Sequence, residues 1–497
     1  MASKDDPVLQ SDTKLPVASN ESTRGSDTNS DSIPVSKELT KTWRSYLWDT
    51  LDKSPEERRF LNKLDAVILS LASLGYFIKY LDQVNVSSAF VSGMKEDLGL
   101  YGNQLNYMTM CWTVGYVIGE IPSNMLLTRI RPSIWIPACE VTWSVLTILL
   151  TQCSSATQIY ALRFFIGLAE SGFYPGMQYV IGSWYRKDEL AKRSCIFHAC
   201  GSIGSMFSGY LMAAVYRLDG KNGYHGWQWL FIVNTVISLP IAMIGFFLMP
   251  DVPDVTRAFW LTDAEKALAR TRMRHEGRVG RGRGSYSRAT FKRIFTSWHI
   301  YALTLLYVFF NNGSGYGSQP AFQLWLKSEG YGVAAVNSYP TLASAVAVVF
   351  TLLYAWSSDS AFRGARWPPI VFAGTILIIL NSGLAAWDIP LGWKWACYVL
   401  GMMGGGISGL TFAWAHEICS GDNEERALVV AAMNEMAYVV QAWLPLIVWQ
   451  QVEAPRYRKG FITTVFLNVW GDWHGAADPV LASPGERAEG AEEGFVI

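Results

Sequence analysis

Apolar runs of about 20 residues recur along most of this chain, and they constrain its fold more than any other feature. A helix of about 20 apolar residues crosses the roughly 30 Å hydrocarbon core of a bilayer. Of the 497 residues, 50% are hydrophobic and 16% are charged, whereas soluble domains average about 25% charged residues. The pattern therefore predicts an all-α protein that crosses a membrane many times.

The apolar runs form two sets. We expect helices of the first set at 64–90, 105–126, 134–153, 156–182, 194–215 and 227–249. Helices of the second set are expected at 298–326, 336–357, 368–387, 393–415 and 427–450, with a partial twelfth from Gly460. Two similar halves of six helices around a site at the membrane midplane are typical of secondary transporters.

The two sets predict five segments along the chain. These are a disordered tail at 1–45, an N-terminal half at 46–250, a cytoplasmic connector at 251–297, a C-terminal half at 298–470 and a polar tail at 471–497. In the connector, Thr262-Asp-Ala-Glu265 is a capping box that opens a short amphipathic helix, which ends near Met273.

The last apolar run, Gly460–Trp470, has about eleven residues, too few to cross a bilayer as a helix. We expect either a truncated twelfth helix or a spurious reading of the gene's last exon.

Lysine and arginine concentrate before the first helix, in the connector and in alternate loops. Cytoplasmic loops carry such an excess of basic residues. The bias predicts a cytoplasmic N-terminus and a cytoplasmic connector.

The fourth predicted helix carries two charges, Arg163 and Glu170. A charge at a helix centre costs about 2.5–3.5 kcal/mol, so such residues usually line a cavity or form internal pairs. In one interpretation, Arg163 binds an anionic substrate and Glu170 carries the coupling proton. In the other, Arg163 forms a structural salt bridge to Glu170 or to a neighbouring helix, and Glu170 belongs to a fixed ion pair on the cytoplasmic side.

The first helix carries Lys79 and Asp82, one turn apart. They can form an internal ion pair that contributes to substrate binding (Lys79) and proton coupling (Asp82). Alternatively, Lys79 extends to the outer membrane surface and Asp82 only neutralises it. Glu140, in the third helix, is a further candidate for proton coupling.

In the seventh helix, residues 311–320 are too polar and glycine-rich for a lipid-facing span. A broken helix that lines a cavity explains them. Asn312, Tyr316 and Gln319 are therefore substrate candidates, as is Asn434 in the eleventh helix.

Other functional classes find little support. The seven cysteines lack metal-ligand spacing, the net charge is zero, and no zinc-protease or nucleophile-elbow motif occurs. We expect no enzyme activity, cofactor, metal or nucleic-acid partner, and we interpret the arginine-rich stretch 277–284 as a solvated loop.

Several motifs resemble the major facilitator superfamily, and within it the anion:cation symporters. The fourth-helix segment Arg163–Gly176 is similar to that family's signature. Other stretches are similar to the fungal allantoate permease group and its pantothenate transporter-like branch: Leu51–Arg59, Gly75–Gln83, Val91–Asp97, Gly115–Pro122 and Ile181–Tyr185.

The resemblance implies a monomeric, proton-driven importer of a small organic monocarboxylate in the plasma membrane, with pantothenate as the leading substrate. It gives Arg163 a role in anion recognition and Glu170 a role in proton coupling. Asp359, Arg363 and Arg366 in the 8–9 turn are then gating residues.

The chain also departs from the family. The 2–3 turn lacks the usual Asp beside Arg129 and Arg131, and Gln83 stands where animal relatives have an arginine. An exporter of a carboxylated secondary metabolite, a permease for another vitamin or an allantoate-type anion, and a nutrient sensor remain alternatives.

Overall fold

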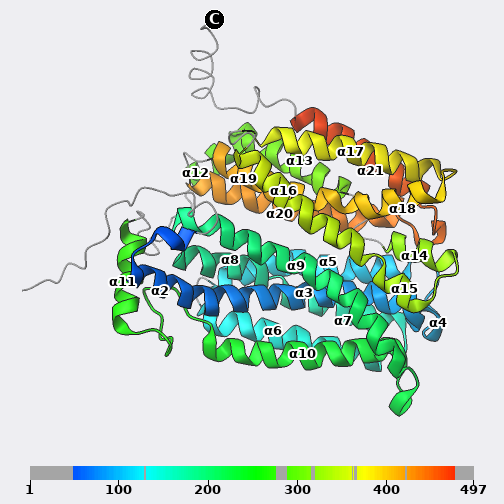
Figure 1. The fold of residues 1–497 in the computed structure, drawn as a ribbon, viewed down its shortest axis with the longest axis horizontal. Helices are drawn as coiled ribbons and strands as arrows, with labels where there is room; N and C mark the ends of the chain where they lie inside the picture. The colour runs from blue at the N-terminus through cyan, green and yellow to red at the C-terminus, as the bar shows by residue number, and fades with distance from the viewer. Residues whose placement is uncertain are drawn as a thin grey trace, which may run out of the picture. The chain divides into compact units, whose positions relative to one another are not determined.

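The structure is a computed structural model that describes residues 49–127, 130–275, 288–314, 320–360, 362, 366–419 and 423–475. The chain divides into two compact units, Met1–Pro55 and Glu56–Ile497. In the first unit, the described residues include the short 3-10 helix η1 (Asp49–Asp52). The second unit contains the helical bundle of Figure 1.

The first set of helices starts with a nearly continuous helical rod. The rod consists of α2 (Pro55–Leu64), η2 (Asp65–Leu69), α3 (Ser70–Ala89), η3 (Phe90–Met94) and α4 (Lys95–Asp97). The set continues with α5 (Gln104–Leu127), α6 (Pro132–Leu149), η4 (Leu150–Gln152), α7 (Ala156–Glu170), α8 (Phe173–Trp184), α9 (Lys187–Val215), η5 (Tyr216–Leu218), η6 (Lys221–Gly223) and α10 (Gly226–Leu248).

Two connector helices follow, α11 (Asp263–His275) and α12 (Arg288–Thr296). The second set then comprises α13 (Trp298–Gly313), α14 (Ala321–Ser328), α15 (Val333–Ser338), α16 (Thr341–Ser360), α17 (Trp367–Ala386), α18 (Leu391–Leu400), η7 (Gly401–Gly406), α19 (Ile407–Ile418), α20 (Asn423–Val448), η8 (Gln451–Glu453) and α21 (Arg458–Gly475). We call the end of the bundle near α2 and α11 the connector end, and the end near α4 and α15 the distal end (Figure 1).

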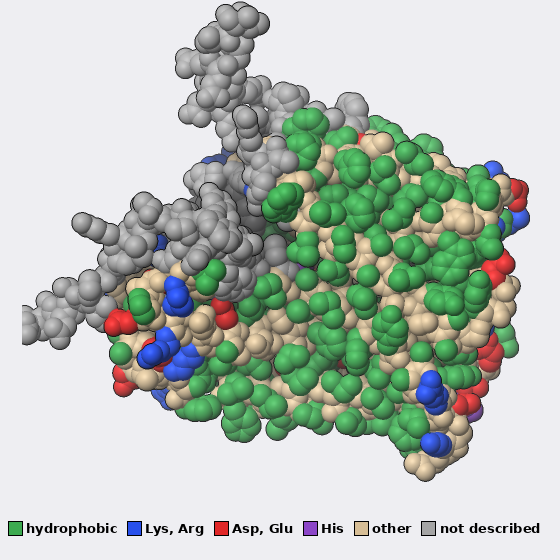
Figure 2. Space-filling view, viewed as in Figure 1, with side chains coloured by type: hydrophobic (Ala, Val, Ile, Leu, Met, Phe, Trp, Pro, Cys, Tyr) green, Lys and Arg blue, Asp and Glu red, His purple; other side chains and the backbone are tan. Residues whose placement is uncertain are grey.

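The surface has the character expected of a membrane protein. Figure 2 shows hydrophobic side chains over the middle of the bundle and charged side chains toward its two ends. Among the described residues, six helical segments are long and apolar enough to cross a membrane. Every regular element described is helical, so the predicted all-α, multi-pass fold is confirmed.

Two helices differ from their predicted form. The first helix begins at Pro55, nine residues before the predicted start, because α2 is amphipathic and its polar residues escape an apolar-run search. The fourth is interrupted after Glu170 and resumes at Phe173. Pro175 has no N–H to donate to the carbonyl of Ser171, which explains an interruption at this point.

The twelfth helix is longer than predicted. Helix α21 has 18 residues and continues five residues past Trp470, so it is about 27 Å long at 1.5 Å per residue. The predicted boundary at 470/471 was wrong because the helix continues through Asp472, whose carboxylate packs against Gly374 of α17. Thr375 donates a hydrogen bond to Asp472 at 3.4 Å, and Gly471 lies against the ring of Phe310.

The predicted capping box is confirmed at the start of α11. The Thr262 N–H donates to Glu265 Oε2 at 2.8 Å, and the Glu265 N–H donates to Thr262 Oγ1 at 3.3 Å. Lys63 of α2 also pairs with Glu265 at 2.8 Å. Burial opposes ionisation of Glu265, but the hydrogen bonds from Lys63 and Thr262 outweigh it and hold the pKa of this carboxyl below its usual value.

Two glycines allow α5 and α7 to pack in close contact. A Cβ added to Gly115 would lie 2.1 Å from the Phe164 carbonyl oxygen, and one added to Gly167 would lie 2.1 Å from the Trp112 carbonyl oxygen. Backbone cannot yield as a side chain can, so the absence of a side chain at both positions sets the separation of these helices. Their contact positions Arg163 and Glu170 against α5.

We therefore expect Gly167→Ala to destabilise the protein by about 1–3 kcal/mol through overpacking. Gly409→Ala is the matched control, because a Cβ there meets nothing within 4 Å and alanine favours a helix. Thermal unfolding of the purified variants measures both. A melting temperature for Gly167→Ala at or above that of the control contradicts the packing argument.

Candidate substrate site

Arg163 is a buried cation that forms no ion pair with any described residue. Its side chain is 4% exposed, and its Cζ lies 5.7 Å from the centre of the Trp112 ring. The Nε has no hydrogen-bond acceptor, and within the described residues no carboxylate lies close enough to Arg163 to form an ion pair. Because a buried charge is costly unless paired, this guanidinium is suited to a ligand that brings its own negative charge.

Glu170 lies two turns along the same helix and is fully buried. Its Oε2 accepts a hydrogen bond from Trp112 Nε1 at 3.2 Å, and its Oε1 is buried and meets no donor among the described residues. Trp112 therefore lies between the two charged groups, and Glu170 and Arg163 interact only as separated charges. The direct salt bridge between Arg163 and Glu170 that the sequence left open is not formed.

The predicted ion pair between Lys79 and Asp82 is wrong. Lys79 donates to the Tyr116 hydroxyl at 3.4 Å, while Asp82 accepts a hydrogen bond from Asn234 of α10. Residues three apart on a helix point in directions about 60° apart, and here that difference sends the two side chains to different neighbours. Lys79 is 3% exposed, so the alternative that it extends to the membrane surface is also wrong.

Lys79, Asp82, Arg163 and Glu170 form what we call the central charged cluster. Lys79 interacts electrostatically with Glu170, and Asp82 interacts with both Glu170 and Arg163. Glu140 lies apart from these groups: its carboxylate packs against Gly75 of α3 and lies near Gly245 of α10. The structure thus brings together four of the predicted residues of the first set and separates the fifth.

The predicted residues of the second set lie in different places. Asn434 donates to Glu120 Oε1 of α5 at 3.0 Å. Asn312 donates to the carbonyls of Val308 at 3.0 Å and Ala437 at 3.5 Å. The predicted break in the seventh helix is confirmed, because α13 ends at Gly313 and α14 starts at Ala321. Tyr316 and Gln319 lie outside the described residues.

Sequence reasoning missed two acidic residues and a group of tyrosines. Glu120 and Glu435 lie on α5 and α20, and each interrupts an apolar run just as Arg163 does. The same search would therefore have found them. The tyrosines interact electrostatically with one another or with Glu120, and they come from both sets of helices: Tyr76, Tyr80, Tyr116, Tyr174, Tyr307 and Tyr438. A tyrosine in an apolar run gives no comparable signal.

At the distal end, polar side chains join the two sets of helices. Asn106 of α5 donates to the Trp449 carbonyl at 2.8 Å, and Asn337 of α15 donates to Ser92 Oγ at 2.8 Å. Lys327 of α14 pairs with Glu96 at 2.8 Å. These contacts link the two sets of helices at the distal end.

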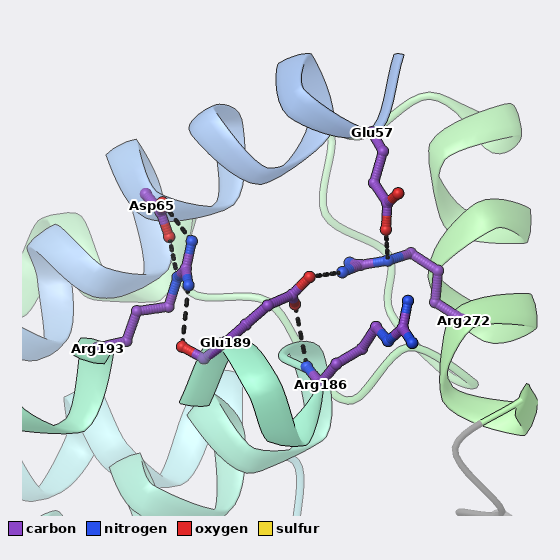
Figure 3. A network of polar contacts seen from close by, with 6 residues as sticks. All are labelled: Glu57, Asp65, Arg186, Glu189, Arg193 and Arg272. Carbon is purple, nitrogen blue, oxygen red and sulfur yellow. Dashed lines mark hydrogen bonds and ion pairs between the residues drawn. The ribbon is translucent and has the colours of Figure 1, made fainter. Parts of the chain in front are cut away.

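At the connector end, a buried ion network ties α11 to the first set (Figure 3). Arg272 of α11 lies between Glu57 of α2, at 2.9 Å, and Glu189 of α9, at 2.5 Å. Arg193 of α9 donates to both oxygens of Asp65, at 2.6 and 2.8 Å. The network connects helices of the first set with the connector.

The predicted gating residues are described only in part. Arg366 Nη1 donates to Ser358 Oγ at 2.9 Å across the turn between α16 and α17. Arg363 and the side chain of Asp359 lie outside the described residues. Their gating role stays a prediction.

These features agree with comparisons to known proteins. The family model of the Major Facilitator Superfamily matches residues 72–445. The chain belongs to this superfamily and is a secondary transporter.

Among similar sequences, the MFS transporter PfmaC of Pestalotiopsis fici is 38% identical over 440 residues, covering 87% of this chain and 82% of that protein. The pantothenate transporter liz1 of Schizosaccharomyces pombe is 35% identical, covering 82% of this chain and 79% of its own length. The pantothenate transporter FEN2 of Saccharomyces cerevisiae is also 35% identical, with coverage of 82% and 80%.

Solved structures share the fold at low sequence identity. A bacterial homologue of the human lysosomal transporter Spinster, inward-facing and occupied, matches with a TM-score of 0.61 at 16% identity, over 84% of this chain and 98% of that one. A D-xylose–proton symporter matches with a TM-score of 0.62 at 13% identity, over 82% and 96%.

Proposed function

We propose that this protein is a proton-coupled importer of a small organic monocarboxylate, and that pantothenate is its substrate. The observation that carries the proposal is the buried Arg163 guanidinium, which has an unsatisfied Nε and no ion-pair partner among the described residues. A planar guanidinium binds a carboxylate through two parallel hydrogen bonds. The names of the two yeast relatives at 35% identity support pantothenate in particular.

Charge balance in the central charged cluster supports coupling to protons. Within the cluster, two cations, Lys79 and Arg163, face two carboxyls, Asp82 and Glu170, and Lys79 also faces Glu120 of α5. A bound carboxylate adds one negative charge where uncompensated charge is costly. A proton that enters with the substrate restores the balance, and the unpartnered Glu170 Oε1 offers it a site.

The basic residues favour a cytoplasmic connector end and N-terminus, and we place the protein in the plasma membrane as an importer. The connector helix α11 carries Lys266, Arg270, Arg272 and Arg274 in 13 residues, as the rule for cytoplasmic loops requires. Helix α7 then runs inward, so Glu170 lies about 10 Å deeper than Arg163 at 1.5 Å per residue. The substrate would meet Arg163 first.

Uptake into a fungal host that lacks its own pantothenate uptake tests the proposal. We expect labelled pantothenate to enter faster as the external pH falls, and the effect to disappear with a protonophore. We also expect growth on pantothenate concentrations that do not support the untransformed host. Uptake that does not change with pH or with the protonophore would contradict proton coupling. Growth rescue by another acid alone would contradict pantothenate as the substrate.

A further inference from the structure

Helices α5 and α20 pack antiparallel and form a seam between the two sets of helices. Asn106 of α5 binds the carbonyls of Pro445 and Trp449 near the distal end. Farther along, the rings of Tyr116 and Tyr438 lie 5.0 Å apart. Closer to the connector end, Asn434 donates a hydrogen bond to Glu120. Any motion that opens the connector end between these helices must break this contact.

A second carboxyl lies at that contact. Glu435, next to Asn434 on α20, is within hydrogen-bonding reach of Glu120. Glu120 Oε1 is already bound by Asn434, while Oε2 is buried and meets no donor among the described residues. A proton shared between the two carboxyls supplies the missing hydrogen bond, whereas two carboxylates in this position repel each other.

The groups around Glu120 do not neutralise the two negative charges that Glu120 and Glu435 carry when both are ionised. Tyr116 of α5, Tyr174 of α8, Tyr307 of α13 and Tyr438 of α20 face Glu120, and each is a neutral group. The cation that faces it, Lys79 of α3, also faces Glu170 of α7. Lys79 therefore interacts with carboxyls on two sides, so its single positive charge does not neutralise both Glu120 and Glu435.

We propose that Glu120 and Glu435 share one proton and act as a proton-dependent latch between α5 and α20. With the proton bound, an O–H···O hydrogen bond joins the carboxyls and the connector end stays closed. Loss of the proton to water at the connector end leaves two negative charges, and their repulsion opens the seam. The latch rests on the proposed proton-coupled function, and it makes release of this proton the step that admits the substrate to the cytoplasm.

Glutamine tests the latch because it has the shape of a protonated glutamate and cannot lose the proton. For each coupled proton, one pH unit of gradient drives about tenfold accumulation, since it is worth about 1.36 kcal/mol. In proteoliposomes with labelled pantothenate, wild-type protein should gain about tenfold accumulation for each pH unit of gradient from this proton. We expect Glu435→Gln and Glu120→Gln to lack this gain. Counterflow should be lost as well, because the connector end cannot open to exchange label, whereas the purified variants should still bind labelled pantothenate. Glu435→Asp should restore accumulation.

The outcomes separate the latch from the proposed function. Wild-type protein that accumulates no pantothenate under a pH gradient would contradict the proposed function. Wild-type protein that accumulates it, with both glutamine variants equal to wild type, would contradict the latch alone. Counterflow retained by both glutamine variants would also contradict the latch, because the connector end would then open without loss of the proton. Loss of pantothenate binding by the purified variants would contradict it too, because it would place the pair in substrate binding.

A measurement on the wild-type protein does not depend on variants that fold. Hydrophobic carbodiimides modify carboxyls in their protonated form in apolar surroundings. We expect mass spectrometry to find the adduct on Glu120 or Glu435, and its yield to fall as the pH rises. Absence of the adduct from both residues at low pH would contradict a shared proton.

Discussion

Arg163→Lys should weaken pantothenate transport on the order of 10- to 150-fold in apparent affinity, although it keeps the positive charge. The expected loss corresponds to one charge-assisted hydrogen bond, worth about 1.5–3 kcal/mol. Lysine is a point charge on a flexible stem and cannot present the planar fork that arginine offers to a carboxylate. Arg163→Ala should abolish uptake. Initial rates over a range of pantothenate concentrations measure both effects.

Arg217→Lys is the matched control, because Arg217 is exposed at the distal end and lies outside the central charged cluster. Its apparent affinity should equal that of the wild-type protein. If Arg163→Lys binds pantothenate as tightly as this control, Arg163 does not recognise the carboxylate.

Arg272→Met should destabilise the protein more strongly than Gly167→Ala. Arg272 is 4% exposed and contacts carboxylates of two helices, Glu57 and Glu189. Removing one partner of a buried ion pair costs about 3–5 kcal/mol, because the remaining charges stay buried. The melting temperature of the purified protein should fall, and protease cleavage in the connector should become faster as α11 loses its attachment.

Lys266→Met in the same helix provides the comparison. Lys266 pairs with Asp263, whose side chain is fully exposed, and such surface pairs contribute about 0–1 kcal/mol. Equal melting temperatures for the two variants would show that the network of Figure 3 does not hold α11 to the first set.

Most of the fold follows from the sequence because each span must satisfy its backbone polar groups internally, and a helix does this alone. The apolar runs therefore located the helices, and the capping box located the start of α11. The errors have two causes. Pro175 interrupts the fourth helix through a local backbone effect that a search for apolar runs ignores, and the polar residue Asp472 remains helical because of a tertiary contact with Thr375 of α17.

The site was less predictable than the fold. Charges within apolar runs identified Arg163 and Glu170, since a buried charge is rarely accidental. Which groups they contact depends on how helices distant in sequence pack together. Helix α5 supplies two of these contacts. Its Trp112 lies between the two charges, and its Tyr116, rather than Asp82, is the neighbour of Lys79. Spacing along one helix cannot reveal either contact.

Proton movement during transport tests the central claim most directly, namely that the central charged cluster binds an organic anion together with a proton. Purified protein in liposomes that contain a pH-sensitive dye should acidify the interior when pantothenate is added outside, in step with uptake of the label. Arg163→Ala should show neither signal. Pantothenate uptake without acidification, or with proton movement in the opposite direction, would contradict the account.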